Sequence, residues 1–250
     1  MPIWLQAGMW GLIAGSALVI GAAVAWWVRV PRLMVASVMA FGAGVLISAL
    51  SFDLVAEAEQ LGGLAPTVLG FLAGAVAYLL ANLALARRGA RHRKRSGKEQ
   101  VAESQLPGSG PAIAIGALLD GVPESIVLGV SLLNGYGVGV PVLAAIFLSN
   151  LPEGLSSAAG MKRSGRSAGY VFGVWGSIAV ASGVAGLLGC LLLQGASDIT
   201  IATITAVGAG AILAMVADTM IPEAFERTHL YAGLLVAVGF LSSFTISQLA

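Results

Sequence analysis

Long apolar stretches separated by short polar breaks run through the whole chain. They lie near residues 8–28, 33–57, 66–86, 111–133, 140–160, 170–194, 200–222 and 231–249. Each is close to the length of about 20 residues that a helix needs to cross a bilayer. The pattern therefore predicts an all-α polytopic membrane protein with eight transmembrane helices, forming a single transmembrane domain over residues 1–250.

One polar break is much longer than the others. Residues 87–110 (RRGARHRKRSGKEQVAESQLPGSG) are charged and rich in Pro, Gly and Ser, which predicts a loop between spans three and four. Its basic residues favour a role as a topology anchor that contacts lipid headgroups. Metal capture or regulation is the alternative for this loop.

Basic residues follow the odd-numbered spans only. All 13 Lys and Arg residues fall there: Arg29 and Arg32; Arg87, Arg88, Arg91, Arg93, Lys94, Arg95 and Lys98; Lys162, Arg163 and Arg166; and Arg227. Cytoplasmic loops carry an excess of Lys and Arg. With eight spans, this predicts a cytoplasmic basic loop and N- and C-termini on the outside.

Composition supports lipid as the main surrounding of the chain. Hydrophobic residues make up 58% and charged residues only 10%, against roughly 25% charged residues in ordinary soluble domains. The net charge of +1 gives no reason to expect a nucleic-acid partner. Cys190 is the single cysteine and cannot form an intrachain disulfide. His92 and His229 both lie in connections, which excludes a histidine-only metal site inside the membrane.

Carboxylates occur where the predicted spans should be apolar. Asp120 and Glu124 lie in span four and Glu153 in span five, while Asp53, Glu57, Asp218 and Glu223 lie toward the ends of spans two and seven. An ionised carboxylate at a helix centre costs about 2.5–3.5 kcal/mol on insertion scales. No Lys or Arg lies inside any span to pair with them. We therefore expect the carboxylates of spans four and five to bind a cation, and Asp53, Glu57 and Glu223, near span ends, to be solvated at the interface. Asp218 lies deeper, which favours a functional role for it.

Spacing places the ligands of each span on one face. Asp120 and Glu124 are four residues apart, as are Ser149 and Glu153, and Asn150 precedes Glu153 by three. A proline directly precedes both glutamates and weakens a helical hydrogen bond one turn upstream. The Pro-Glu pair recurs at residues 222–223, which indicates internal pseudosymmetry.

These features together resemble the ZIP (Zrt/Irt-like) metal transporter family, near its bacterial GufA-type branch. The family pattern His-Asn-x-Pro-Glu-Gly of span four reads Asp-Gly-Val-Pro-Glu-Ser at residues 120–125, and span five reads Ser-Asn-Leu-Pro-Glu-Gly at residues 149–154. The family's usual His is thus Asp120, and its Asn is Gly121. A Glu that serves a second metal on span six is also missing, with Ser182 at the matching position.

The resemblance implies a carrier that moves a divalent cation toward the cytoplasm by alternating access, without an enzymatic activity or a bound cofactor. The implied metal ligands are Asp120, Glu124, Asn150, Glu153 and Ser149, with Asp53 and Asp218 along the pathway. Zn²⁺ is the first choice, and oxygen ligands also suit Mn²⁺, Fe²⁺, Co²⁺ or Cd²⁺. The family implies a bacterial inner membrane, and Gly-rich helix faces would permit a homodimer.

Three other functions fit parts of the pattern. An intramembrane aspartyl hydrolase would use two of Asp53, Asp120 and Asp218, although no Gly-x-Gly-Asp element precedes them. A membrane metal sensor would bind without flux. A proton- or sodium-coupled carrier of another solute would neither carry divalent metals nor be inhibited by them.

Overall fold

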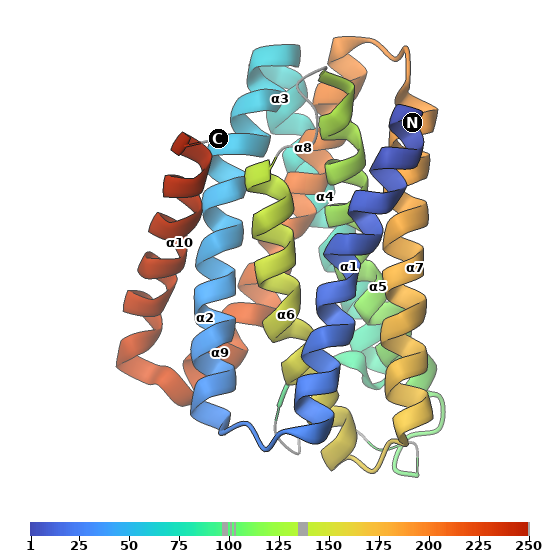
Figure 1. The fold of residues 1–250 in the computed structure, drawn as a ribbon, viewed down its shortest axis with the longest axis vertical. Helices are drawn as coiled ribbons and strands as arrows, with labels where there is room; N and C mark the ends of the chain where they lie inside the picture. The colour runs from blue at the N-terminus through green and yellow to red at the C-terminus, as the bar shows by residue number, and fades with distance from the viewer. Residues whose placement is uncertain (97–99, 101, 103, 135–139, 250) are drawn as a thin grey trace.

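The computed structural model describes residues 1–96, 100, 102, 104–134 and 140–249. These residues form helices and no strand (Figure 1). In chain order the elements are α1 (Ile3–Trp27), α2 (Arg32–Ala49), the π-helical η1 (Leu50–Leu54), α3 (Val55–Gly62), α4 (Leu64–Leu85), the π-helical η2 (Ala86–Ala90), α5 (Ser109–Ser131), the 3-10 turn η3 (Leu132–Asn134), α6 (Val140–Arg163), α7 (Ala168–Leu193), α8 (Asp198–Met215), the π-helical η4 (Val216–Met220), α9 (Ile221–Thr228), the 3-10 turn η5 (His229–Tyr231) and α10 (Ala232–Leu249).

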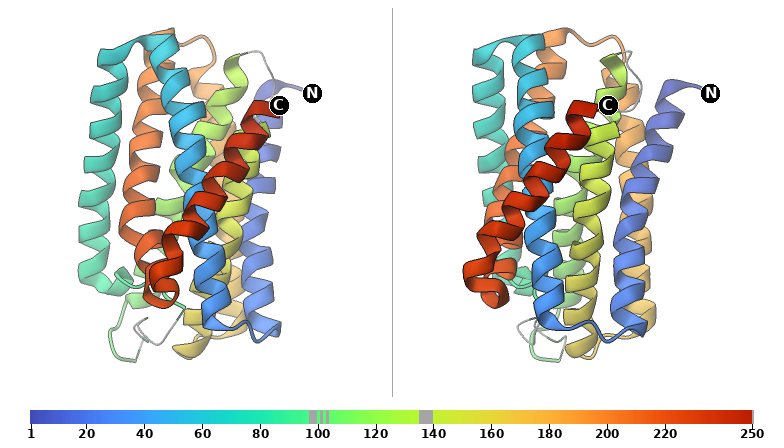
Figure 2. Two further views of the ribbon diagram at one scale, coloured as in Figure 1. Left: turned by 90° about the vertical axis from the view of Figure 1, so that its left-hand side faces the viewer. Right: turned by 60° about the vertical axis from the view of Figure 1, so that its left-hand side comes forward.

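Seven stretches of the described chain are long and apolar enough to cross a membrane, which makes this a multi-pass membrane protein. The last stretch, Asp198–Leu249, has 52 residues, and a straight helix of that length would be about 78 Å long. Instead the chain turns at His229, whose φ is 44° and ψ −112°. Helix α10 then runs back along α2 to the end of the bundle that holds both termini (Figure 2).

The connections fall at two ends of the bundle. Those between α1 and α2, α4 and α5, α6 and α7, and α9 and α10 all lie at the end opposite the termini (Figure 1). These are the connections that carry the basic residues, so we call this the basic end and the other the terminal end. The loop predicted at 87–110 is shorter than expected, because η2 extends α4 to Ala90 and α5 begins at Ser109.

Two interrupted helices repeat the same design. The series α2–η1–α3 and α8–η4–α9 each consist of 18, 5 and 8 residues. Gly44 and Gly210 are both the thirteenth residue of their first helix, and Glu57 and Glu223 are both the third residue of their last. Helix α3 lies at the terminal end and α9 at the basic end, so the repeats point in opposite directions (Figure 1). The pseudosymmetry expected from the recurring Pro-Glu pair thus extends over whole helices.

Glycine allows each interrupted helix to touch its neighbour through the backbone. A Cβ on Gly44 would lie 1.9 Å from the carbonyl oxygen of Val236 on α10, and one on Gly210 would lie 1.9 Å from that of Phe71 on α4. No side chain fits at such a distance. The two repeats therefore each consist of an interrupted helix fixed against one straight helix by small-residue packing, as is common between helices in lipid.

Helices α5 and α6 occupy the interior between these units. Each continues through its internal proline, Pro123 in α5 and Pro152 in α6, without a break in the helix. Helix α1 packs against both α6 and α7, and α5 packs against α7 and α8. This arrangement places the middle of α5 and α6, where the carboxylates lie, at the centre of the bundle.

Candidate functional site

Three buried carboxylates lie at the middle of the bundle. Asp120 and Glu124 on α5 are 2% and 1% exposed, and Glu153 on α6 is 3% exposed. The four-residue spacing on α5 directs its two side chains to one face, as the sequence predicts. We call these three residues the carboxylate centre.

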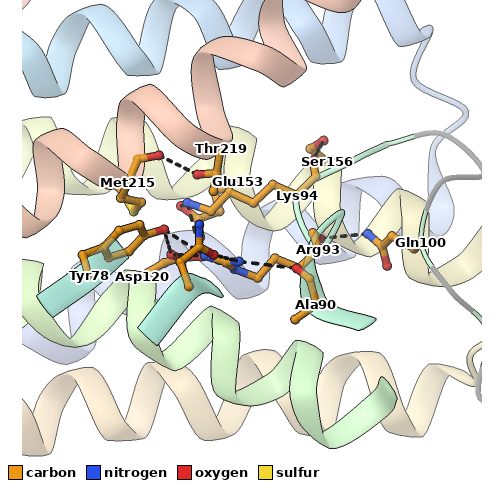
Figure 3. Close-up of polar contacts among 11 residues, drawn as sticks. Tyr78, Ala90, Arg93, Lys94, Gln100, Asp120, Glu153, Ser156, Met215 and Thr219 are labelled. Carbon is orange, nitrogen blue, oxygen red and sulfur yellow. Dashed lines mark hydrogen bonds and ion pairs between the residues drawn. The ribbon is translucent and has the colours of Figure 1, made fainter. Parts of the chain in front are cut away.

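Cations from the basic loop enter this centre, which corrects the expectation that no Lys or Arg faces the carboxylates. Arg93 and Lys94 lie between η2 and α5 and belong to no helix, yet their exposed fractions are only 2% and 3%. Figure 3 shows both side chains extending from the loop toward Asp120 and Glu153. The expectation was wrong because it considered only residues within the spans, whereas the loop folds back between the helices.

Arg93 makes a two-pronged ion pair with Asp120. Its Nε donates to Oδ2 at 2.9 Å and its Nη2 to Oδ1 at 2.8 Å. Nη2 also donates to the Tyr78 hydroxyl at 2.8 Å, Tyr78 donates to Asp120 Oδ1 at 2.8 Å, and Nη1 donates to Asn82 Oδ1 at 2.8 Å. Burial by itself lowers the pKa of the Arg93 guanidinium, but the adjacent Asp120 carboxylate raises it to a net value above its usual range. Arg93 is therefore a permanently charged clamp on Asp120.

Lys94 bridges the two helices. Its Nζ lies 2.8 Å from Glu153 Oε2 and 3.4 Å from Asp120 Oδ2. A compact ammonium between two buried carboxylates takes the place in which a bound cation would be expected. Lys94 is thus the group that neutralises Glu153.

Glu124 forms no ion pair of this kind with any residue that the structure describes. Both of its carboxylate oxygens are buried and make no hydrogen bond to any part of the chain that the structure describes. A buried carboxylate of this kind requires a proton, water or a cation. Glu124 is the unsatisfied group of the centre.

The segment Arg93–Ser96, which we call the plug, is held by several polar contacts. Gln100 Nε2 lies 2.9 Å from the Arg93 carbonyl, 3.0 Å from the Arg95 carbonyl and 3.0 Å from that of Ser157 on α6. Ser156 donates to the Lys94 carbonyl at 2.6 Å. These contacts fix the plug along the inner face of α6.

The far end of the plug is fixed to α9. The Ser96 amide donates to Glu223 Oε1 at 2.9 Å, and Arg95 forms ion pairs with both Glu223 and Glu226. Glu223, which is only 3% exposed, was expected to be solvated at the interface. That expectation was wrong, because its carboxylate instead anchors the plug.

Two glycines leave room for the plug. A Cβ on Gly160 of α6 would lie 2.1 Å from the Arg95 carbonyl oxygen and 2.2 Å from Gln100 Nε2. A Cβ on Gly116 of α5 would lie 2.6 Å from Arg93 Cδ. Both helices therefore have glycine where the plug passes closest.

The remaining predicted ligands lie nearby on α6 and make other contacts. The Ser149 hydroxyl donates to the Ile146 carbonyl of its own helix at 3.0 Å, and Asn150 donates to the Ala14 carbonyl of α1 at 3.0 Å. Ser182, on α7, is 2% exposed, and its Oγ would lie 3.6 Å from a Cβ on Gly121. Among the described residues, no three His, Cys, Asp or Glu side chains are arranged to hold a metal ion. The five-residue ligand set remains a prediction.

The two predicted pathway residues lie in corresponding π-helical segments near opposite ends of the bundle. Asp53, in η1, accepts a hydrogen bond from Ser247 of α10 at 2.7 Å, and its other oxygen is buried without a described partner. Asp218, in η4, is exposed. π-Helical turns inside α-helices occur frequently at functional sites. The sequence placed both aspartates on a pathway but did not reveal these irregular turns.

A cavity lies beside Asp218 and extends to Lys94. Its volume is about 670 Å³, and its lining includes Asp218, Asn82, Arg87, Arg95 and Lys94. Lys94 therefore lies between this cavity, whose wall it forms in part, and the carboxylates of Asp120 and Glu153.

Neither the family models nor the curated proteins include a match to this chain. The resemblance to ZIP transporters therefore rests on the residues of spans four and five and on the order of the helices.

Sequence reasoning missed the most consequential part of this site. Arg93, Lys94, Gln100 and Gly160 were assigned either to the loop or to helix packing. The run Arg-His-Arg-Lys-Arg at residues 91–95 was the available signal. A run of positive charge by itself, however, predicts a solvated segment. The inward position of Arg93, Lys94 and Arg95 follows only from their ion pairs with carboxylates on three helices, α5, α6 and α9.

Proposed function

We propose that this protein is a divalent metal cation transporter, with Zn²⁺ the first candidate and Mn²⁺, Fe²⁺, Co²⁺ or Cd²⁺ as alternatives. The observation that carries the proposal is the unsatisfied Glu124 beside two further carboxylates in the middle of a membrane protein. Intramembrane acids of this kind usually mark an ion pathway. The resemblance to ZIP proteins supports the metal and the inward direction.

The balance of charge favours a divalent ion over a monovalent one. When ionised, the three acids of the centre carry three negative charges, whereas Arg93 and Lys94 carry two positive charges. If a divalent ion replaced Lys94 while Arg93 stayed on Asp120, positive and negative charges would be equal. A monovalent ion in the same place would leave one negative charge unbalanced in a medium of low dielectric constant, which is costly.

We assign the main ligands to Glu124 and Glu153, because these acids lie on the two facing helices and neither is clamped by arginine. Asp120 contributes from the side of Arg93. Asn150 and Ser149, on the same helix as Glu153, complete an oxygen-rich set after a small rotation of their side chains. Such ligands accept Mn²⁺ and Fe²⁺ as well as Zn²⁺.

The proposed topology has eight transmembrane helices, with α8–α9 and α10 as separate spans and both termini outside. Its support is that every connection with basic residues lies at one end of the bundle, which the positive-inside rule places in the cytoplasm. The ion would pass Asp53, bind at the centre and leave through the cavity at Asp218. A bacterial inner membrane is the proposed location.

Uptake into liposomes tests this function. The purified protein would be reconstituted, and uptake of Zn²⁺, Cd²⁺, Mn²⁺ and Fe²⁺ compared with that of a Glu124→Ala, Glu153→Ala double variant. Glu59→Ala is the matched control, because Glu59 is an exposed carboxylate on α3. We expect saturable uptake that falls by roughly tenfold or more in the double variant and is unchanged in the control.

Other outcomes would favour the other functions. Ion binding without uptake would favour a metal sensor. The absence of both, in a preparation that is folded by size-exclusion chromatography, would refute metal transport and favour a proton- or sodium-coupled carrier. An aspartyl hydrolase is not favoured, because Asp120 is clamped by Arg93, Asp53 is bonded to Ser247, and Asp218 lines the cavity.

A further inference from the structure

The plug combines features of a ligand with features of a loop. Its Lys94 ammonium lies 2.8 Å from Glu153 and 3.4 Å from Asp120, where the proposed function places the transported ion. Its backbone, in contrast, makes hydrogen bonds with the side chains of Gln100, Ser156, Arg163 and Glu223. The Lys94 ammonium at the carboxylate centre is thus attached to the plug, whose outer end is bound to α9 at the basic end.

We infer that Lys94 is a tethered competitor of the transported ion: its ammonium occupies the carboxylate centre, and a divalent ion binds only when Lys94 and the plug leave. This inference rests on the proposed function and adds a regulatory role for a named residue. Lys94 would set the ion concentration at which the site fills, because the ion must displace a resident charge. The plug would then move toward the 670 Å³ cavity that Lys94 already lines.

The surroundings of the plug fit a segment that docks and leaves. Gly160 allows the Arg95 carbonyl to approach α6 at a distance that no other residue permits. The backbone carbonyls of Arg93, Lys94 and Arg95 accept from Gln100 and Ser156, which are neutral side chains that water can replace at modest cost. At the outer end of the plug, the Ser96 backbone bonds to the charged side chains of Glu223 and Arg163. Docking is therefore specific, and polar contacts hold the plug from Arg93 to Ser96.

The charge pattern also explains why Lys94, rather than Arg93, is the group that leaves. Arg93 makes bonds to three partners, Asp120, Tyr78 and Asn82, in a planar arrangement that a guanidinium fits well. Lys94 makes ion pairs with two of the described residues, Glu153 and Asp120. A divalent ion has two positive charges. One replaces the charge of the departing ammonium, and the other balances the negative charge of the ionised Glu124 carboxylate.

Binding of Mn²⁺ to purified variants, measured by calorimetry, tests the competition. Lys94→Gln removes the positive charge of the plug. Gly160→Ala displaces the plug from α6 without changing the residue at position 94. Arg91→Gln is the control for charge, since Arg91 is exposed in the same loop, and Gly173→Ala is the control for helix substitution, since a Cβ there meets nothing within 4 Å. If the plug is docked in nine molecules of ten, removing it lowers the apparent dissociation constant about tenfold. We expect this change in Lys94→Gln and Gly160→Ala and none in either control.

Thiol labelling follows the plug directly. In a Cys190→Ser background, Ser96→Cys places a thiol on the plug at a position that is 4% exposed, and Ser104→Cys places one at an exposed position of the same loop. Mn²⁺ should accelerate maleimide labelling at residue 96 and leave residue 104 unchanged. Adding Lys94→Gln should make residue 96 react rapidly without Mn²⁺.

The outcomes separate this inference from the proposed function. If Mn²⁺ binds the wild-type protein, but the four variants bind it equally and labelling at residue 96 does not respond, the tethered competitor is refuted and the transporter stands. If neither the wild-type protein nor Lys94→Gln binds Mn²⁺, Zn²⁺ or Cd²⁺, both proposals fall.

Discussion

Replacing Arg93 with Met should lower the free energy of unfolding by about 3 kcal/mol, because it leaves Asp120 as a buried charge without its main partner. Removing one member of a buried ion pair typically costs about 3–5 kcal/mol. The lower end applies here, since Tyr78 still donates to Asp120 at 2.8 Å and the Lys94 ammonium lies 3.4 Å away. Methionine replaces the side chain as far as Nε, so the volume left empty is that of the guanidinium carbon and its two terminal nitrogens.

Unfolding in micelles with increasing dodecyl sulfate, followed by tryptophan fluorescence, measures this change. The decisive comparison is the double variant Arg93→Met, Asp120→Leu, in which neither charge remains. We expect it to recover about 2 kcal/mol of the loss, because the two substitutions remove one shared interaction. Arg91→Met, at an exposed position of the same loop, should change the stability by less than about 0.5 kcal/mol.

Two results would refute the reasoning. A single Arg93→Met variant as stable as the wild-type protein would show that the clamp is not formed. Strict additivity of the two substitutions would show that Arg93 and Asp120 do not interact, whatever each contributes alone.

Two further predictions concern helix packing and the unsatisfied acid. Gly210→Ala should lower the free energy of unfolding by about 2 kcal/mol, because its Cβ would lie 1.9 Å from the Phe71 carbonyl oxygen. The control Gly173→Ala should change it by less than about 0.5 kcal/mol, and equal effects of the two variants in the same unfolding assay would contradict this packing. Glu124→Gln should raise the free energy of unfolding by about 1 kcal/mol while abolishing ion binding measured by calorimetry, since it removes a buried charge without a described partner. Unaltered ion affinity in that variant would remove Glu124 from the site.

The sequence was a good guide to the helices and to the position of the carboxylates. Apolar length predicts the helices, and the spacing of Asp120 and Glu124 predicts their common face, because both follow from helix geometry. Boundaries were less accurate: η2 continues the helix that begins with α4 into the expected loop as far as a kink at Gly89 (φ 94°), and α5 begins at Ser109, two residues before the expected span.

The contacts of the loop could not be predicted in the same way. Whether Lys94 meets Glu153 depends on a fold that brings residues 59 positions apart together, and periodicity contains no such information. The same holds for the anchor at Glu223, which is far from Ser96 in sequence. Positive charge near a span end predicts orientation reliably, but it does not distinguish a solvated loop from one that folds inward.

The glycine contacts of the two repeats correspond, whereas the polar contacts beside them differ. Gly74 of α4 and Gly239 of α10 make equivalent backbone contacts, with Cβ positions 1.9 Å and 2.0 Å from the carbonyl oxygens of Val207 and Phe41. Counting eight residues onward from each glycine reaches Asn82 on α4 and Ser247 on α10.

The residue of η4 that corresponds to Asp53 is Thr219, one position after Asp218, so the contact between Ser247 and Asp53 does not carry over to Asn82 and Asp218. In the present structure Asn82 accepts from Arg93 instead, and Asp218 stands open beside it in the cavity. Arg93 thus ties Asn82 of α4 to Asp120 of α5, whereas the other repeat has a direct hydrogen bond between η1 and α10. The two mirrored halves of the bundle therefore differ in the polar contact beside their glycines, and the basic loop supplies the difference.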